Sequence, residues 1–479
     1  MAVASIKKNI ASGIKWNTIS VIGTRSTDFV VKLILARLLL PEAYGIIGMA
    51  MIIINFLQVI SDMGLFNALV QKKEDALTET RYSSAFWFLL AIGTGFIALF
   101  FTVISPFGAS FYQEPRLVPI LNALSLYLFF NILTIIPRVI LTKKLAFKTL
   151  VTIRFSGSVV SSIVAITLAF SGFGVWSLVM KYLLGSGIIF ISYWARVGWK
   201  PRFTFQGSSL RQLAGYSTYT QVNGILFFFR NNVDYLIIGK LVSAHMLGVY
   251  TLAFTLSEAL RGQLYSIFNK VLFPVYSKMQ DDLPMIREYY LKIMTLTATV
   301  TFPVSVLFIG LSPDIILVLF GEEWVEAAAP LRILSVASMI FAISGTPAEV
   351  LKSIGKPSVS FYLNITNTFL VALPGIYFGL KYFGLTGVAY AVCLHYTTSR
   401  ITFHYFMKKY IHVSDKDVFA ALSKPVLGAA MMLFIILLIT RIGMPPLPNM
   451  IIAGAAGGLA YGLLFARDLK QGVKLLKKS

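Results

Sequence analysis

Long apolar stretches alternate with short polar segments along the whole chain, and most charged residues lie in the polar segments. A bilayer core about 30 Å thick is crossed by about 20 predominantly apolar residues of α-helix. The pattern therefore predicts an all-α polytopic membrane protein. Its expected transmembrane helices, fourteen in all, lie at roughly 12–36, 44–68, 84–106, 118–141, 154–172, 174–195, 212–239, 246–268, 290–311, 329–350, 358–379, 385–407, 419–440 and 448–466.

The composition indicates that the bilayer, and not water, is the solvent of this chain. The 479 residues are 57% hydrophobic and 13% charged, with a mean hydropathy of +0.77, whereas soluble domains carry about 25% charged residues. In a soluble protein, the net charge of +22 would suggest nucleic-acid binding. Because the cations cluster between the apolar stretches, as membrane topology requires, we expect no nucleic-acid partner.

The Lys and Arg residues between the predicted helices indicate the sidedness of the chain. With the N-terminus inside, 30 of the 42 Lys and Arg residues fall on the inner side and 6 on the outer side. This bias predicts that both termini are cytoplasmic. The basic N-terminal stretch MAVASIKKNIASGIKW lacks the compact apolar region of a cleaved signal peptide, so we expect the first helix to be retained.

The chain contains an internal repeat. The stretch Ala36–Ile46 recurs as Gly239–Val249, at an offset of 203 residues and with matching glycines. Chance similarity between two apolar hairpins is the alternative interpretation. Since the copies lie six predicted helices apart, a true repeat places both halves in the same membrane orientation, as in some transporters. We expect two six-helix lobes, residues 1–200 and 201–412, followed by an accessory helix pair and basic cytoplasmic tail in residues 413–479.

Several segments resemble the polysaccharide-transporter branch of the MOP flippase superfamily. They are ARLLLPEAYGIIGMA, SDMGLFNALVQKK, RNNVDYLIIGKLVSAHMLGVYTLAFTL, FNKVLFPVYSKMQDD and LSPDIILVLFGEEWVEAAAPLRIL. The chain is similar to Wzx-type exporters of the colanic acid and teichuronic acid kind. The resemblance implies a multi-pass protein of the bacterial inner membrane that flips undecaprenyl-diphosphate-linked oligosaccharides by alternating access. It implies as partners this glycan, a coupling ion (proton or sodium), membrane lipids, and the polysaccharide polymerase and export machinery.

Charged residues within the predicted helices mark the candidate site, since each is costly unless it is paired or faces water. Guanidinium and ammonium groups suit a diphosphate cargo, and neighbouring carboxylates can hold them or exchange a cation. The expected cationic residues are Arg25, Lys32, Lys181, Arg230, Arg261 and Arg400. The expected charge partners or coupling residues are Asp28, Asp62, Asp234 and Glu258. The resemblance gives Arg25 and Arg261 as the family's cavity arginines. Alternatively, the charge pairs only neutralise one another and lock helices together.

Motifs of enzymatic chemistry are absent from the sequence. We find no nucleotide-binding glycine loop and no hydrolase or protease signature. The four histidines have no metal-ligand spacing, and Cys393 is the single cysteine. We therefore expect a transporter without catalytic residues, metal or cofactor. The alternative functions are a cation-coupled multidrug antiporter of the MATE type and a membrane-embedded glycan polymerase or ligase.

Overall fold

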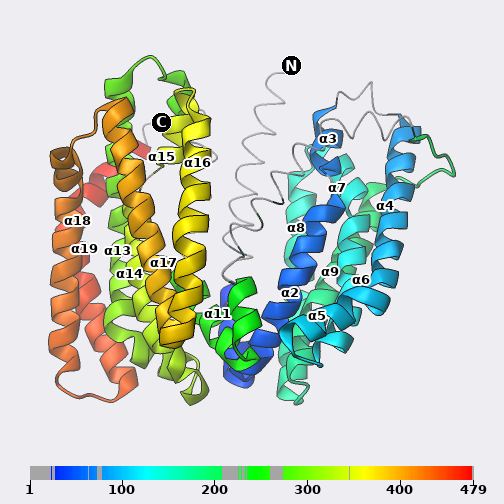
Figure 1. Cartoon of the computed structure of the whole chain (residues 1–479), viewed down its shortest axis with the longest axis horizontal. Coiled ribbons are helices and arrows are strands. Elements are labelled where there is room, and N and C mark those ends of the chain that lie inside the picture. The colour runs from blue at the N-terminus through cyan, green and yellow to red at the C-terminus, as the bar shows by residue number, and fades with distance from the viewer. Residues whose placement is uncertain are drawn as a thin grey trace. The chain divides into compact units, whose positions relative to one another are not determined.

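The structure is a computed structural model that describes residues 23, 27–62, 64–72, 78–207, 225, 228, 232, 235–258, 272, 275–344 and 346–476. Every secondary-structure element within these ranges is helical (Figure 1). The chain is organised as two compact units, residues 1–248 and 249–479. The division at residues 200 and 412 that the sequence predicts stays a prediction.

Within its described residues, the first unit consists mainly of helices. After a helical segment at 27–38 come α2 (Pro41–Asp62), α3 (Leu65–Gln71), α4 (Glu79–Leu99), α5 (Ser105–Tyr112), α6 (Leu117–Leu133), α7 (Ile135–Lys143), α8 (Phe147–Phe170) and α9 (Val175–Val197). A π-helical turn, η2 (Phe100–Ile104), continues α4 into α5. Helices α8 and α9 pack along each other, and α6 packs against α9, α4 and α2.

Helix α11 (Ala244–Glu258) begins in the first unit, and the remaining elements form the second. They are α13 (Leu283–Leu319), η3 (Glu322–Ala327), α14 (Ala328–Ile343), α15 (Pro347–Ser353), α16 (Pro357–Asn367), η4 (Thr368–Ala372), α17 (Leu373–Ile411), α18 (Asp415–Thr440) and α19 (Pro446–Leu476). Local signals set the helix starts. The Asp282 carboxylate accepts from the backbone N–H of Met285 at the start of α13, and Ser414 and Asp417 form a reciprocal capping box at the start of α18.

Within the described ranges, ten helices are long and apolar enough to cross a membrane. The longest of them, Pro357–Ile411, is two helices in space. Gly384 has φ +61° and ψ −147° inside it, a conformation open to glycine and strained for other residues. The chain folds back at this point, because a Cβ built on Gly379 would lie 2.5 Å from the carbonyl oxygen of Gly387. The structure thus supplies eleven of the fourteen predicted spans, and the polytopic all-α fold is confirmed. The other three, 12–36, 212–239 and 246–268, lie partly outside the described residues.

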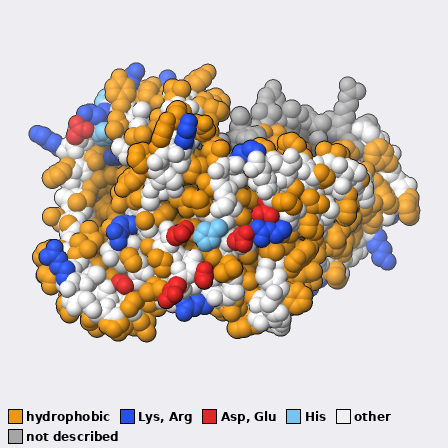
Figure 2. Space-filling model, turned by 60° about the horizontal axis from the view of Figure 1, so that its bottom comes forward, with side chains coloured by type: hydrophobic (Ala, Val, Ile, Leu, Met, Phe, Trp, Pro, Cys, Tyr) orange, Lys and Arg blue, Asp and Glu red, His pale blue; other side chains and the backbone are white. Residues whose placement is uncertain are grey.

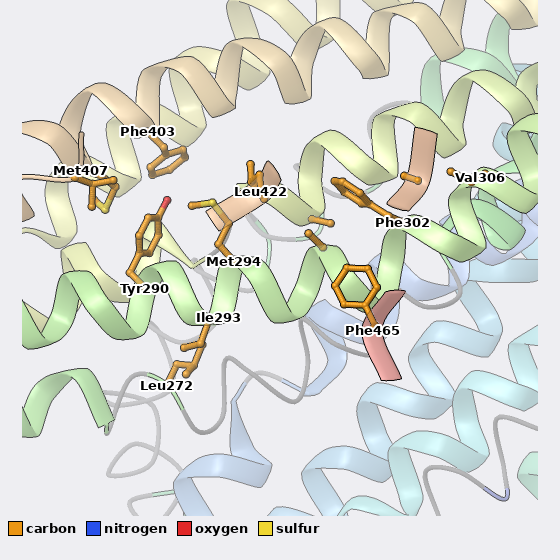
Figure 3. Close-up of a cluster of buried hydrophobic side chains, with 14 of the residues drawn as sticks. Leu272, Tyr290, Ile293, Met294, Phe302, Val306, Phe403, Met407, Leu422 and Phe465 are labelled. Atoms are coloured by element: carbon orange, nitrogen blue, oxygen red, sulfur yellow. The ribbon is translucent and has the colours of Figure 1, made fainter. Parts of the chain in front are cut away.

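The second unit has a continuous apolar core. Figure 3 shows Tyr290 and Met294 of α13 facing Phe403 and Met407 of α17, with Leu422 of α18 and Phe465 of α19 in the same cluster. The C-terminal helices α18 and α19 pack on each other and on α13. Figure 2 shows that apolar side chains dominate the visible surface, as expected where lipid is the solvent.

The internal repeat has a structural counterpart in the first unit. Helix α2 starts at Pro41 and α11 at Ala244, which keeps the offset found in the sequence. The two helix starts also contact each other reciprocally. A Cβ built on Gly45 would lie 1.7 Å from the carbonyl oxygen of Ala244, and one built on Gly248 would lie 1.8 Å from that of Pro41. Each repeat copy therefore contributes one glycine at the contact. Because this glycine has no side chain, the first turn of the other copy's helix can pack directly against its backbone.

A buried polar clamp fastens the turn between α18 and α19. The amide nitrogen Nδ2 of Asn449, a residue 3% exposed, donates to the Asp314 carboxylate on α13 at 2.6 Å and lies 3.4 Å from Oγ1 of Thr440. We expect Asn449→Leu to lower the thermal unfolding midpoint, because it leaves the carboxylate without this donor at a cost of about 1–3 kcal/mol. Fluorescence-detected unfolding of purified protein in detergent measures the shift. Asn364→Leu, which removes only bonds within one helix turn, is the matched control, and equal shifts would contradict the clamp.

Candidate functional site

Two of the predicted cationic residues in the first unit, Lys32 and Lys181, lie near one carboxylate, that of Asp28. Lys181 of α9 places its Nζ 3.6 Å from Oδ1 of Asp28, which lies on the helical segment 27–38. The hydroxyl of Ser158 on α8 donates to the same oxygen at 3.3 Å. Lys32, one turn after Asp28, interacts electrostatically with both Asp28 and Lys181. Two helical segments therefore bring two ammonium groups and one carboxylate together, and a third helix adds a hydroxyl. Among these described residues, the cluster has two formal positive charges and one negative charge.

Polar aromatic side chains frame this cluster. The hydroxyl of Tyr44 on α2 donates to the backbone carbonyl of Lys32 at 3.3 Å. Tyr182 follows Lys181 on α9, interacts electrostatically with Asp28, and meets Tyr127 of α6 edge to face with ring centroids 5.8 Å apart. The Lys181 side chain is 17% exposed and that of Asp28 is 43% exposed. The ammonium group is thus largely enclosed, while the carboxylate remains accessible.

The second unit contains a separate cation within the predicted membrane span. Nη1 of Arg400 on α17 lies 3.3 Å from the hydroxyl of Tyr290, and Nη2 lies 4.0 Å from Sδ of Met294. Tyr290 is fully buried, and its hydroxyl donates to the carbonyl of Ser344 at 3.3 Å. Among the described residues, no carboxylate forms an ion pair with Arg400. Within the described part of the chain, its guanidinium group therefore contacts a neutral phenol and a thioether.

The structure describes only some of the remaining predicted site residues. Glu258 is half-buried at the end of α11. Asp62 ends α2, and its side chain lies outside the described part of the chain. Arg25, Arg230, Asp234 and Arg261 also lie outside the described residues. The structure therefore brings together Asp28, Lys32 and Lys181, and it places Arg400 in a second environment.

Sequence reasoning missed the supporting residues of the Asp28 cluster. Ser158 belongs to the segment SGSVVSS, whose serines recur at helical spacing within an otherwise apolar span. Such a polar stripe within a span was an available signal that α8 has a polar neighbour. The contribution of Tyr44 had no comparable signal, because interfacial and packing tyrosines look the same in a sequence.

An ion-pair network lies outside the spans, at the turn between α5 and α6. Arg116 donates from Nε to Oε1 of Glu114 at 2.7 Å, and its Nη2 contacts Oε1 of Glu42 on α2 at 2.5 Å. The hydrogen bond from Arg116 lowers the pKa of Glu114 below its ordinary value of 4.5. The Glu114 side chain is mostly enclosed, while those of its two partners are exposed.

This network predicts a small, pH-dependent contribution to stability. A carboxylate whose pKa is lowered on folding stabilises the folded protein above its ordinary pKa, and the contribution is lost as the pH falls through the folded-state value. We expect Arg116→Ala to lower the free energy of unfolding by up to about 1 kcal/mol near neutral pH. The difference from wild type should shrink as the pH falls below 4.5. Unfolding curves at a series of pH values test this, and a difference that grows on acidification would contradict it.

Among the described residues, no group of three or more His, Cys, Asp and Glu side chains could hold a metal ion. The thiol of Cys393 on α17 contacts the carbonyl of Ile333 at 3.2 Å.

Comparison with known proteins identifies the family. Residues 34–329 match the family described as polysaccharide biosynthesis protein. The chain belongs to this family. It is 26% identical over 481 residues to the teichuronic acid biosynthesis protein TuaB of Bacillus subtilis (strain 168), covering 99% of each chain. It is 23% identical over 467 residues to the lipopolysaccharide biosynthesis protein WzxC of Escherichia coli (strain K12), covering 96% of this chain and 90% of WzxC.

The fold of the chain also has a solved counterpart. The lipid II flippase MurJ in its inward closed conformation superposes with a TM-score of 0.72 at 19% identity, covering 95% of this chain and 99% of MurJ. At this identity the similarity establishes the fold. The predicted membership of the polysaccharide-transporter branch of the MOP superfamily is confirmed by the family match together with this fold.

Proposed function

We propose that this protein is a flippase that moves undecaprenyl-diphosphate-linked oligosaccharides from the cytoplasmic to the outer leaflet of a bacterial inner membrane. Membership of a polysaccharide biosynthesis family and a flippase-like fold support this proposal. The observation that carries it is the surplus positive charge around Asp28, where two lysines share one carboxylate inside an apolar helical unit. A buried cation of this kind is costly, and a phosphate-bearing cargo would compensate for that cost.

The described residues suggest how the cargo is held. The Lys181 ammonium group rests on Asp28 in the free protein and exchanges this contact for a cargo phosphate oxygen, so the charge is paired in both states. Arg400 offers a planar fork of donors, which matches the oxygens of a diphosphate or of an acidic sugar. Arg25, Arg230 and Arg261 stay predicted members of the same cationic set. Asp28, Asp62, Asp234 and Glu258 stay the predicted charge partners, or the groups that bind a coupling proton or sodium ion.

The proposal includes the topology and the partners of the transporter. The distribution of Lys and Arg supports cytoplasmic N- and C-termini. Cargo therefore enters from the side on which lipid-linked glycans are assembled and leaves to the polymerase and export machinery. Transport draws on the cargo gradient, the membrane potential or a coupled ion, and requires no catalytic residue.

A multidrug antiporter of the MATE type is the alternative on the same fold. Such a transporter of organic cations needs an apolar site with acidic residues. The Asp28 cluster has the opposite balance, since two cations surround one acid, and Arg400 adds a cation in the second unit. The charge of the described site thus favours an anionic cargo.

Complementation tests this proposal directly. A strain that lacks the protein is expected to lose its surface polysaccharide and to accumulate lipid-linked repeat units on the cytoplasmic leaflet, and wild-type protein is expected to reverse both effects. Accessibility of the repeat units to a membrane-impermeant glycosidase distinguishes the leaflets in vesicles of defined orientation. If the protein changes only the accumulation of cationic drugs, the antiporter replaces the flippase.

A further inference from the structure

The segment that follows α9 is fastened to the start of α4. Residues 198–206, called the strap below, begin at Gly198, whose φ of +66° ends α9. The backbone N–H groups of Arg202 and Gln206 donate to the hydroxyls of Ser83 and Ser84 at 3.0 and 2.9 Å. Both serines are fully buried. The strap appears in Figure 1 as the green loop beside α4.

Side chains reinforce this attachment. The indole N–H of Trp87 on α4 donates to the carbonyl of Arg202 at 2.8 Å, and the Arg202 guanidinium pairs with Glu79 at the first residue of α4. The ring of Phe203 stacks on Trp87 with centroids 5.1 Å apart. The backbone of the strap is therefore attached to α4 by three hydrogen bonds.

The attachment presents apolar groups outward. Phe203 is 93% exposed although its ring touches Trp87, and Phe205 is 62% exposed. An aromatic cluster lies behind them, in which Phe86 contacts Trp194 and Trp199 edge to face. Aromatic side chains with one polar edge are typical of the boundary between headgroups and acyl chains. An ordered backbone that exposes two phenylalanines to water would be costly, whereas insertion into that boundary is favourable.

The charges around the strap indicate which kind of lipid headgroup it would contact. Arg196, Lys200 and Arg202 are exposed, and Glu79 is the acid that pairs with one of them. Phospholipids with anionic headgroups complement this surplus, and Lys and Arg side chains reach the headgroups while their alkyl stems lie along apolar surface. We propose that the strap docks in the headgroup layer of the cytoplasmic leaflet and favours anionic phospholipid. This proposal rests on the orientation given above, which places the strap on the cytoplasmic side.

Docking would anchor the connection between the two repeat halves to the inner leaflet. The strap links α9, the last helix of the first half, to the residues that begin the second half. Because it is tied to α4 by backbone and side-chain bonds, the position of α4 relative to the bilayer would be fixed as well. The lipid therefore acts on the transporter at a site separate from the Asp28 cluster.

A fluorescent label tests the docking without any transport assay. The single cysteine allows unique labelling, so Cys393→Ser with Thr204→Cys carries an environment-sensitive fluorophore on the strap. Lys356→Cys in the same background is the matched control, because it is an exposed loop residue predicted to lie on the same side. The labelled proteins are reconstituted in phosphatidylcholine vesicles, with and without phosphatidylglycerol. We expect the label at position 204 to be quenched by lipid-borne quenchers, more strongly with phosphatidylglycerol, and the label at position 356 to stay water-exposed.

Further variants separate the contributions. Phe203→Ala with Phe205→Ala should reduce quenching in both kinds of vesicle. Arg196→Ala and Lys200→Ala should each weaken the preference for phosphatidylglycerol by about fivefold, while leaving Arg202 and its ion pair intact. If the label at position 204 is as water-exposed as the control label, the proposal is overturned. If quenching at position 204 is the same with and without phosphatidylglycerol, the preference for anionic lipid is overturned. If the Thr204→Cys thiol is protected from labelling in cells but not in vesicles, a protein and not lipid covers the strap. If a membrane-impermeant reagent labels this thiol in intact cells, the strap does not lie on the cytoplasmic side.

Discussion

Replacing Gly45 or Gly248 with alanine is expected to abolish polysaccharide export and to reduce the amount of folded protein. The added Cβ would lie within 2 Å of a backbone carbonyl oxygen, that of Ala244 in one case and that of Pro41 in the other. Backbone cannot move aside as the end of a side chain can, so the helix starts must separate. Overpacking of tightly packed sites typically costs about 1–3 kcal/mol, and a backbone obstacle places these substitutions at the upper end.

The measurement combines membrane protein level, thermal unfolding and surface polysaccharide. Gly458→Ala on α19 is the matched control, because nothing lies within 4 Å of its added Cβ. It should be neutral or stabilising by up to about 1 kcal/mol, since alanine favours helix over glycine. Because the contacts are reciprocal, the double variant should cost less than the sum of the two single ones. Wild-type stability and export in either single variant would show that the crossing of the helix starts is loose.

The sequence predicted this contact only in part. The repeat at an offset of 203 residues marked Gly45 and Gly248 as equivalent positions, and the structure starts a helix at equivalent residues in each copy. Equivalence within a repeat does not reveal that the two copies touch each other. That contact depends on packing between distant segments, and hydropathy contains no information about partners.

The lengths of the membrane-spanning helices could also be predicted only in part. The predicted helix at 290–311 is part of α13, which runs from Leu283 to Leu319. Its first turns carry Arg287, Glu288 and Lys292, which are helical but too polar to count as apolar span. A hydropathy pattern marks the part of a helix that faces lipid, whereas capping by Asp282 decides where the helix begins. The turn at Gly384 was placed correctly, because a break in hydropathy coincides with it.

The candidate site could be predicted as a set of residues but not as an arrangement. Spacing within one helix puts Asp28 and Lys32 on a common face. Nothing in the sequence assigns Lys181 to that face, because the choice between neighbouring helices depends on how α8 and α9 pack. Arg400 likewise could be identified as a costly intramembrane charge, while its contact with Tyr290 follows from the packing of α13 and α17.

Lys181→Gln is expected to lower export about tenfold or more, which corresponds to about 1.4 kcal/mol or more of lost cargo stabilisation. The variant leaves Asp28 with the Ser158 hydroxyl and removes the enclosed ammonium group. Because 43% of the Asp28 side chain is exposed, the loss of stability should be nearer the ~1 kcal/mol of an exposed ion pair than the 3–5 kcal/mol of a buried one. Export should therefore fall while the membrane level of the protein stays close to wild type.

The double variant Asp28→Asn/Lys181→Gln separates a cargo site from a structural ion pair. It removes both charges of the pair, so folding should recover, and Lys32 remains as the charged member of the cluster. If Lys181 binds cargo phosphate, export by the double variant stays low although its unfolding midpoint returns to that of wild type. Lys381→Gln, which removes an equal charge from an exposed position outside the cluster, controls for net charge and should export normally. Recovery of both export and stability in the double variant would assign the pair a purely structural role and move the cargo site to the other cations.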